Sequence, residues 1–382
     1  MDRTAAALAL IVLAGLAIGV FRSDQGPPPQ TRNAAAALGG VLGGDADTTG
    51  YARVTGPRPF RFPADHGAHP DYRSEWWYFT GNVDTPDGRP FGVQLTFFRF
   101  ALAPSMPSRR SEWATRQAWM AHFAVTDVQA QKHHAFQRLE RGALGLAGAT
   151  THPVRIWLDD WRAVGGPDAL FPLTLDAREN GVAVHLTLRR GKPVVLQGDR
   201  GYSRKSAEPG NASYYYSYTR LRASGRVHVD GRDYPVRGSV WLDREWSTSA
   251  LAEDQAGWDW FALQLDDGRD VMVYRLRRRG GGVDPASAGV VVGPDGAVTR
   301  LQAGDFTGVP LRYWRSPETG ARYPVAWRLR LPRAGLDVTV HPRLDSQEMA
   351  FSPRYWEGAV TVSDAGGEGN VRGTGYLELT GY

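Results

Sequence analysis

The 382-residue chain contains no cysteine. It therefore cannot form disulfides, bind a metal through thiolates, or carry the lipid of a lipoprotein, which needs a cysteine just after the signal sequence. The chain also lacks a phosphate-binding loop, a dinucleotide-binding fingerprint and the G-x-S-x-G turn of serine hydrolases. These absences leave no sequence support for nucleotide-dependent or serine-hydrolase chemistry.

The chain is also poor in helical pattern, because no long stretch with a 3.6-residue period follows the first two dozen residues. Short alternating or aromatic segments recur instead, and Asp-Gly or Asn-Gly pairs separate them. Each pair can supply the positive φ angles of a type I′ hairpin turn. The five pairs are Asp87-Gly88, Asn180-Gly181, Asp230-Gly231, Asp267-Gly268 and Asp295-Gly296. We therefore predict an all-β protein built from barrels or sandwiches.

A concentrated block of basic charge is absent as well. The net charge is +5, but the arginines are scattered among comparable numbers of acids, and only Arg275–Arg279 is locally dense. With neither a basic stripe nor a nucleic-acid-binding motif, we expect no nucleic-acid partner.

The one long apolar run lies near the start of the chain. Arg3 precedes it, it extends from Ala5 to Phe21, and Arg22 closes it. Residues 1–22 therefore read either as a signal peptide or as an uncleaved membrane anchor, since the run is long for the first and marginal for the second. We expect a periplasmic or extracellular protein, attached to the inner membrane through residues 5–21 if the segment stays. Residues 23–50, rich in proline, alanine and glycine, read as a flexible linker.

The remaining chain shows signs of an internal duplication. Trp76–Phe79 leads to the turn Asp87–Arg89, and Trp258–Phe261 leads in the same way to Asp267–Arg269. In both places an aromatic strand is followed by a DGR turn and a returning apolar strand. We predict two related domains, residues 51–247 and residues 248–382, that meet between Trp246 and Trp258.

Six segments together resemble the AttH and carotenoid 1,2-hydratase (hydroxyneurosporene synthase) family. They follow the family's order over nearly the whole body: Phe62–Val83, Phe91–Phe100, Ser213–Leu221, Gly238–Ser247 (GSVWLDREWS), Gly257–Tyr274 and Tyr355–Tyr382. The resemblance implies two tandem lipocalin-like barrels that pack around an apolar cavity. It also implies an isoprenoid, lipid or polyketide-like ligand and no cofactor. Members include carotenoid hydratases, proteins labelled secreted hydrolases, and pericyclases, so the fold alone does not choose a reaction.

The strongest catalytic candidates lie in the segment Trp241–Trp246. Strand alternation puts Trp241, Asp243 and Glu245 on one face. Burial in an apolar cavity would raise the pKa of one carboxyl enough to leave an acid that protonates an alkene. Trp241, together with tyrosines such as Tyr216, could then stabilise the carbocation through the rings. Trp246 is a further substrate-binding candidate. The resemblance points to Asp243 as the proton donor. The alternative is a salt-bridge cluster in which Arg244 pairs with nearby acids.

A second group of candidates lies in the loop and strand from His66 to Trp77. His66 and His69 followed by Glu75 invite a metal-site interpretation, but His69 precedes a proline and no HExxH motif is present. We therefore predict no metal. The resemblance favours His66 or His69 as hydrogen-bonding groups near the cavity mouth and Glu75 as a buried, paired acid, with Trp77 as an aromatic wall residue. His122, alone in an apolar strand, is a further candidate for the cavity, although such a histidine is more often part of the core.

Three functions remain open at this stage. The first is an enzyme that adds water to, or cyclises, an apolar unsaturated substrate, with Asp243 as the acid. The second is a non-catalytic carrier of lipids or apolar metabolites, which needs only an apolar lining. The third is a structural or maturation factor on the membrane surface, in which the cavity is incidental.

Overall fold

A computed structural model describes residues 48–382, apart from residues 107, 109–110, 168, 250 and 367–370. The predicted signal peptide or anchor (1–22) and most of the predicted linker (23–50) lie outside the described residues. Within the described part the only helical segments are the 3-10 turns η1 (Ala64–His66), η2 (Ala303–Asp305) and η3 (Pro332–Ala334). None of these described helices is long and apolar enough to cross a membrane. The all-β prediction is therefore confirmed.

The first sheet has thirteen strands among the described residues. They are β1 (Ser74–Asp84), β2 (Pro90–Ala101), β3 (Gln117–Asp127), β4 (Lys132–Arg141), β5 (Ala147–Thr151), β6 (Val154–Leu158), β7 (Trp161–Val164), β8 (Leu173–Glu179), β9 (Val182–Arg190), β10 (Val195–Leu196), β11 (Tyr202–Arg204), β12 (Ala212–Val229) and β13 (Arg232–Ser247). The order is β4-β3-β2-β1-β13-β12-β9-β8-β7-β6-β5, and β10 and β11 pair with β12. The sheet curls until β4 approaches the β6–β7 hairpin, where Arg138 forms an ion pair with Asp160.

The second sheet has ten strands in the described part of the chain. They are β14 (Gln255–Leu265), β15 (Asp270–Arg278), β16 (Ala288–Val292), β17 (Val298–Gln302), β18 (Thr307–Arg315), β19 (Arg322–Leu331), β20 (Leu336–Pro342), β21 (Glu348–Met349), β22 (Tyr355–Asp364) and β23 (Val371–Thr380). The order is β17-β16-β15-β14-β23-β22-β20-β19-β18, with β21 beside β22. Like the first sheet, it curls around its own apolar core into a barrel-like domain.

All five predicted turn pairs connect neighbouring antiparallel strands. Only two of them have the conformation that a type I′ turn requires, with positive φ at both residues. These are Asn180 (45°) with Gly181 (80°) and Asp230 (49°) with Gly231 (74°). In the other three pairs only the glycine has a positive φ. The two aromatic segments of the suspected duplication form the β1–β2 and β14–β15 hairpins, the first hairpin of each sheet among the described residues.

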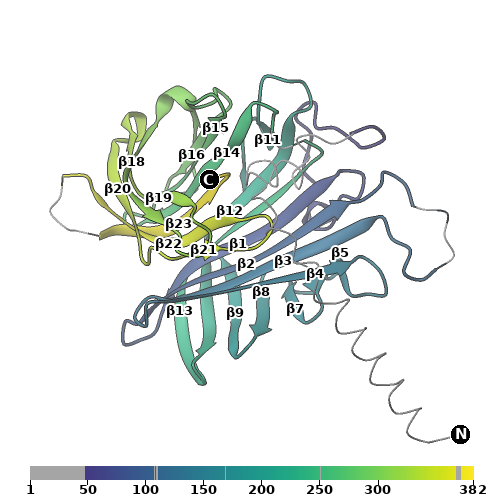
Figure 1. Cartoon of the computed structure of the whole chain (residues 1–382), viewed down its shortest axis with the longest axis horizontal. Helices are drawn as coiled ribbons and strands as arrows, with labels where there is room; N and C mark the ends of the chain where they lie inside the picture. Colours follow the sequence, from purple (N-terminus) through teal and green to yellow (C-terminus); the bar gives the residue numbers. More distant parts are fainter. Residues whose placement is uncertain (1–47, 107, 109–110, 168, 250, 367–370) are drawn as a thin grey trace, which may run out of the picture.

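The two sheets pack against each other through the middle of the chain. The chain leaves the first sheet at Ser247 and enters the second at Gln255. Strand β1 contacts β23, β2 contacts β22, and β12 contacts β14, so the yellow C-terminal strands lie across the purple and blue strands in Figure 1. Strands at this junction are buried on both faces, because one face meets the first barrel's core and the other meets the second domain. This second face carries the candidate site.

Candidate functional site

A cavity of about 90 Å³ lies between the two sheets. That is room for several water molecules or for one small organic group. Its wall is mainly aromatic and includes Trp76, Tyr78, Tyr215, Trp258, Trp260 and Tyr355. Four carboxyl groups interrupt this wall, Asp243 and Glu245 from β13, Glu357 from β22 and Glu378 from β23. Both domains therefore supply acids to one largely apolar space.

Asp243 is buried, with 3% of its surface exposed, and it accepts three hydrogen bonds. Its Oδ1 accepts from the Ser217 hydroxyl at 2.5 Å and from the Trp241 indole N–H at 2.7 Å. Its Oδ2 accepts from the Tyr215 hydroxyl at 2.6 Å. Strand alternation causes the Trp241 contact, since Trp241 and Asp243 are two residues apart on one face of β13. Register causes the Ser217 contact, because Ser217 lies directly opposite Asp243 on β12.

Two of these donors are themselves held by a donor. The Gln197 amide donates to the Ser217 hydroxyl at 2.8 Å, and the Trp260 indole donates to the Tyr215 hydroxyl at 3.3 Å. Because each hydroxyl oxygen accepts a hydrogen bond, the proton of that hydroxyl is free to point toward Asp243. The network around Asp243 is thus arranged to stabilise a carboxylate, and Trp260 brings the second domain into it.

Burial nevertheless raises the pKa of Asp243 to about 7, against the hydrogen bonds from Ser217, Tyr215 and Trp241 that lower it. The nearby Glu245 carboxylate raises it further. A carboxyl with this pKa exchanges its proton readily at neutral pH, which is the property that general acid–base catalysis needs.

Glu245 lies two residues farther along β13 and has a cation partner. Lys205, from the segment between β11 and β12, places its Nζ 2.9 Å from Glu245 Oε1, and the Ser213 hydroxyl donates to the same oxygen. Burial lowers the pKa of Lys205, but Glu245, Tyr274 and Asp243 together outweigh burial, and the net direction is upward. The ammonium also lies 4.6 Å from the centre of the Tyr274 ring. Glu245 and Lys205 therefore form a neutralised pair in the cavity wall.

Glu357 and Glu378 lie opposite each other on β22 and β23 and have no such cation among the described residues. The Tyr78 hydroxyl donates to Glu357 Oε1, and the Trp258 indole donates to Glu378 Oε1 at 3.1 Å. Burial and the neighbouring glutamate raise the pKa of Glu357 well above its usual value. Burial, with the charges of Asp243 and Glu245, raises the pKa of Glu378 to about 8.

The structure places Trp241, Asp243 and Glu245 on one face of β13, as the alternation predicts. Asp243 and Glu245 line the cavity. Trp241 packs edge-on against Trp260, with ring centres 6.2 Å apart, and holds Asp243 through its indole N–H. These three predicted residues are brought together.

Four predicted residues lie on the opposite face of the sheet and do not share the cavity with Asp243. Trp246 and Trp77 belong to the core of the first barrel, as does Tyr216, whose hydroxyl lies 2.7 Å from His66 Nδ1. The expectation of a single site is corrected here. Side chains alternate between the two faces of a strand. Asp243 therefore faces the cavity, and Trp246, three residues farther along β13, faces away from the cavity. The cavity is lined instead by Trp76, the residue before Trp77, and by Tyr215, the residue before Tyr216.

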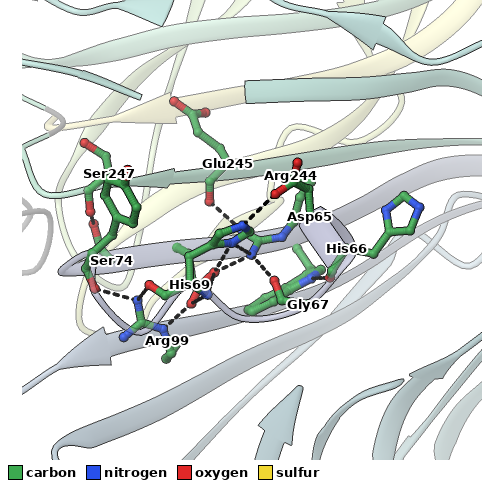
Figure 2. A network of polar contacts seen from close by, with 12 residues as sticks. Asp65, His66, Gly67, His69, Ser74, Arg99, Arg244, Glu245 and Ser247 are labelled. Carbon is green, nitrogen blue, oxygen red and sulfur yellow. Dashed lines mark hydrogen bonds and ion pairs between the residues drawn. The ribbon is translucent and has the colours of Figure 1, made fainter. Parts of the chain in front are cut away.

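His69 and Glu75 belong to a buried ionic network on that opposite face. Figure 2 shows His69, Arg99 and Arg244 of this network. The Glu75 carboxylate forms ion pairs with Arg99 and Arg244 and accepts the His69 backbone N–H at 3.0 Å. Arg244 also donates to the backbone oxygens of Gly67 and Glu245, whereas the Glu245 side chain points the other way (Figure 2). Burial alone would raise the pKa of Glu75, but the two guanidiniums lower it well below its usual range. The network joins the loop around η1 to β1, β2 and β13.

His122 lies behind the cavity wall rather than in it. Its Nδ1 is 2.5 Å from the hydroxyl of Tyr355, which lines the cavity, and its Nε2 is 2.8 Å from the Gln137 amide. Burial lowers the pKa of His122 to about 3, so the ring is neutral at physiological pH. His122 is therefore placed to orient Tyr355.

Sequence reasoning missed Lys205, Glu357 and Glu378 as functional candidates. Both glutamates stand in Tyr355–Tyr382, a segment that carried the family resemblance, and each interrupts an apolar strand. An isolated acid in such a strand is a usable signal, because an unpaired buried carboxyl is costly. Lys205 lies in an irregular segment, where no periodicity indicates its direction. Among the described residues no group of three or more His, Asp or Glu side chains is arranged to hold a metal ion.

The raised pKa values predict how folding stability depends on pH. The unfolded chain releases the protons of Asp243, Glu357 and Glu378 near 3.8 to 4.5, whereas the folded protein keeps them to about pH 7 or above. Stability should therefore fall as pH rises from about 4 to about 8. The lowered pKa of Glu75 acts in the opposite direction, since its stabilisation is lost below about pH 4.5. Urea unfolding should find maximal stability at about pH 5, and Glu378→Gln should flatten the decline above it. A wild-type stability that rises from pH 5 to pH 8 would contradict this prediction.

Comparisons with known proteins agree with this architecture. A family model described as AttH-like matches residues 53–382. Among solved structures, an AttH protein from Nitrosomonas europaea is 36% identical, with a TM-score of 0.76, and the match covers 87% of this chain and 99% of that one. No curated protein matches the chain.

Two more distant structures share the fold. The kievitone hydratase of Nectria haematococca superposes with a TM-score of 0.63 at 12% identity, covering 89% of this chain and 98% of that one. CghA superposes with a TM-score of 0.50 at 14% identity, covering 88% and 95%. At these identities the likeness concerns the arrangement of two lipocalin-like barrels.

Proposed function

Because this chain belongs to the AttH-like family, we propose that it is an exported enzyme of hydratase type, which adds water to a carbon–carbon double bond of an apolar substrate. The observation that carries the proposal is Asp243, a buried carboxyl that exchanges protons near neutral pH at an aromatic cavity between two domains. The kievitone hydratase with the same fold supports the reaction class. Isoprenoid-like and polyketide-like alkenes are the proposed substrates, since the wall is mostly aromatic.

The proposed reaction needs only protons and water. A proton from the cavity's acids adds to one carbon of the alkene and leaves a carbocation at the more substituted carbon. The faces of rings such as Trp76, Tyr215 and Trp260 stabilise this cation, and the attraction is strongest in a desolvated site. A water molecule adds to the cation and gives up one proton to a carboxylate, which yields a tertiary alcohol. No electrons are transferred, so no redox cofactor is required.

The Glu245–Lys205 pair has a separate role in this proposal. Because Lys205 neutralises Glu245, the pair adds polarity to the wall without adding net charge. The Glu245 carboxylate also lies close enough to Asp243 to contribute to the raised pKa of Asp243. Glu245 therefore acts as a positioning residue through Asp243.

The test begins with the purified protein itself. Organic extraction and native mass spectrometry should recover a co-purifying apolar molecule. Incubation with geraniol, a short isoprenoid alkene, in ¹⁸O-labelled water should yield a diol that carries one ¹⁸O. Binding of geraniol without ¹⁸O incorporation would replace the enzyme by the carrier that the sequence left open. A protein that yields no ligand and binds no apolar probe would contradict both functions.

The place of action is part of the proposal. The apolar run Ala5–Phe21 supports export to the periplasm or beyond, with attachment to the inner membrane if the run is retained. Cell fractionation with antibodies against the folded domains distinguishes a released protein from an anchored one. Recovery of the full-length chain in the cytoplasm would contradict export.

A further inference from the structure

Two glutamates of the second domain lie directly across from each other at the cavity. Glu357 and Glu378 are register partners on the antiparallel strands β22 and β23. Side chains of directly opposed residues stand on the same face with Cβ atoms about 5 Å apart. Both residues line the cavity, so the pair faces the space that Asp243 faces.

The pair lacks the neutralising partners that other buried acids of this protein have. Glu75 has two arginines and Glu245 has Lys205, whereas neither Glu357 nor Glu378 has an ion-pair partner within the described part of the chain. Glu357 is 1% exposed, and its Oε2 lacks a hydrogen-bond partner there. A buried carboxylate oxygen left in this way is costly, unless it carries a proton or meets a ligand.

The groups that face the pair also disfavour two negative charges. Tyr78, Tyr355 and Tyr376 are neutral, since burial raises their pKa values well above the usual one. Asp243 and Glu245 add negative potential from β13. Lys205, the one cation that the described residues contribute to the cavity wall, contacts Glu245 rather than this pair. These surroundings favour the protonated form of both carboxyls at neutral pH.

We propose that Glu357 and Glu378 form a dyad of protonated carboxyls, in which the unpartnered Oε2 of Glu357 carries the proton that is donated to the substrate alkene, while Asp243 is the base that receives a proton from the attacking water. This assignment rests on the proposed hydration. It gives the acid to the second domain and the base to the first. The dyad is thus a further catalytic group, distinct from the acid that the sequence singled out.

Hydrogen bonding decides which group has which role. Three donors converge on Asp243 and favour its carboxylate, whereas Glu357 has a free oxygen that can carry a proton toward the cavity. In the forward reaction the dyad loses its proton to carbon, and Asp243 gains one from the water oxygen. Proton transfer from Asp243 back to the dyad, through water in the cavity, restores the starting state. Over the whole cycle the protein neither gains nor loses a proton, and the product contains the elements of one water molecule.

The first test measures the protonation of the two glutamates without any substrate. Infrared difference spectra of the full chain with ¹³C-labelled glutamate should show a protonated carboxyl at pH 7. The two glutamates should titrate in two separated steps, and in either Glu357→Gln or Glu378→Gln the remaining carboxyl should titrate below the upper step. The exposed Glu318→Gln is the matched control and should leave both steps unchanged. Absence of a protonated glutamate at pH 7, or two steps that persist unaltered in the single variants, would overturn the dyad.

The second test separates donor from base by two isotopes. In deuterated, ¹⁸O-labelled water, the wild-type enzyme should place deuterium on carbon and ¹⁸O on the tertiary carbon of geraniol. Asp243→Asn should lose the ¹⁸O while deuterium still exchanges into the alkene, because the dyad can protonate carbon reversibly. Glu357→Gln should lose both labels. Glu378→Asp, which retains a carboxyl at its position, should keep part of both labels. Deuterium incorporation that persists in Glu357→Gln would overturn the donor role.

The two tests also keep this inference separate from the proposed function. The glutamine variants mimic a protonated glutamate in shape and charge, so they should fold with unchanged or increased thermal stability. If the wild-type protein fails to hydrate geraniol, the proposed hydration and the donor role fall together. The infrared result still decides whether the two glutamates are protonated.

Discussion

Asp243→Asn should lower the rate of hydration by a factor of about 10²–10⁴, the range that a positioned acid–base group contributes, while apolar ligands still bind. The asparagine keeps one oxygen for the Ser217 and Trp241 donors, which both use Oδ1. Its amide then faces the Tyr215 hydroxyl, which can turn to accept. The variant should therefore fold, and what it lacks is a carboxyl able to exchange a proton.

Turnover of geraniol, or of the ligand recovered from the purified protein, is the measurement, with calorimetric binding as its companion. Asp233→Asn is the matched control, because Asp233 is an exposed acid on the same strand that contacts only His228 among the contacts described. That control should keep wild-type turnover. If Asp243→Asn retains activity within a factor of about two, acid–base chemistry at Asp243 is contradicted.

Glu75→Gln should destabilise the fold by about 3–5 kcal/mol, because it leaves Arg99 and Arg244 without their counter-charge in the interior. Glu75, Arg99 and Arg244 are all fully buried. The carboxylate stabilises the fold at pH values above its ordinary pKa of 4.5, and this contribution disappears as pH falls through the lowered folded value. The difference between wild type and variant should therefore be full at pH 7 and shrink below about pH 4.

Urea unfolding at pH 7 and at pH 4 measures this difference. Asp230→Asn removes a surface ion pair with Lys132 and serves as the control, which should change stability little. A small effect of Glu75→Gln at pH 7 would show that the network around η1 is dispensable for folding. Retained ligand binding in a folded Glu75→Gln protein would agree with its place on the face away from the cavity.

Alternation along a strand predicted correctly which neighbours of Asp243 share its face. It could not say which face of β1 or β12 meets the second domain, because both faces of these strands are apolar and buried. Trp76 and Trp77 are therefore indistinguishable in the sequence, as are Tyr215 and Tyr216. The register decides between them, since Tyr78 on β1 and Ser217 on β12 both lie opposite Asp243.

The pairing of Glu357 with Glu378 also could not be predicted from the sequence, but the reason is different. Each glutamate is visible as an acid in an apolar strand, but their opposition depends on the pairing of β22 with β23. Whether a buried acid is neutralised also depends on partners distant in the chain. Glu75 meets Arg244, 169 residues away, and Glu357 meets the Tyr78 hydroxyl, 279 residues away. Such partners follow from the packing of whole sheets.

If the similar β1–β2 and β14–β15 hairpins arose by the predicted duplication, the site has a symmetric origin. Tyr78 lies opposite Asp243 on β1 and β13, and Trp260, which the repeat aligns with Tyr78, lies opposite Glu378 on β14 and β23. Asp243 and Glu378 thus occupy equivalent positions in the two halves. A two-fold symmetric pair of identical barrels would present one acid from each copy across its interface. Fusion of two such copies would free the two acids to diverge, one toward a carboxylate held by three donors and the other toward a protonated carboxyl.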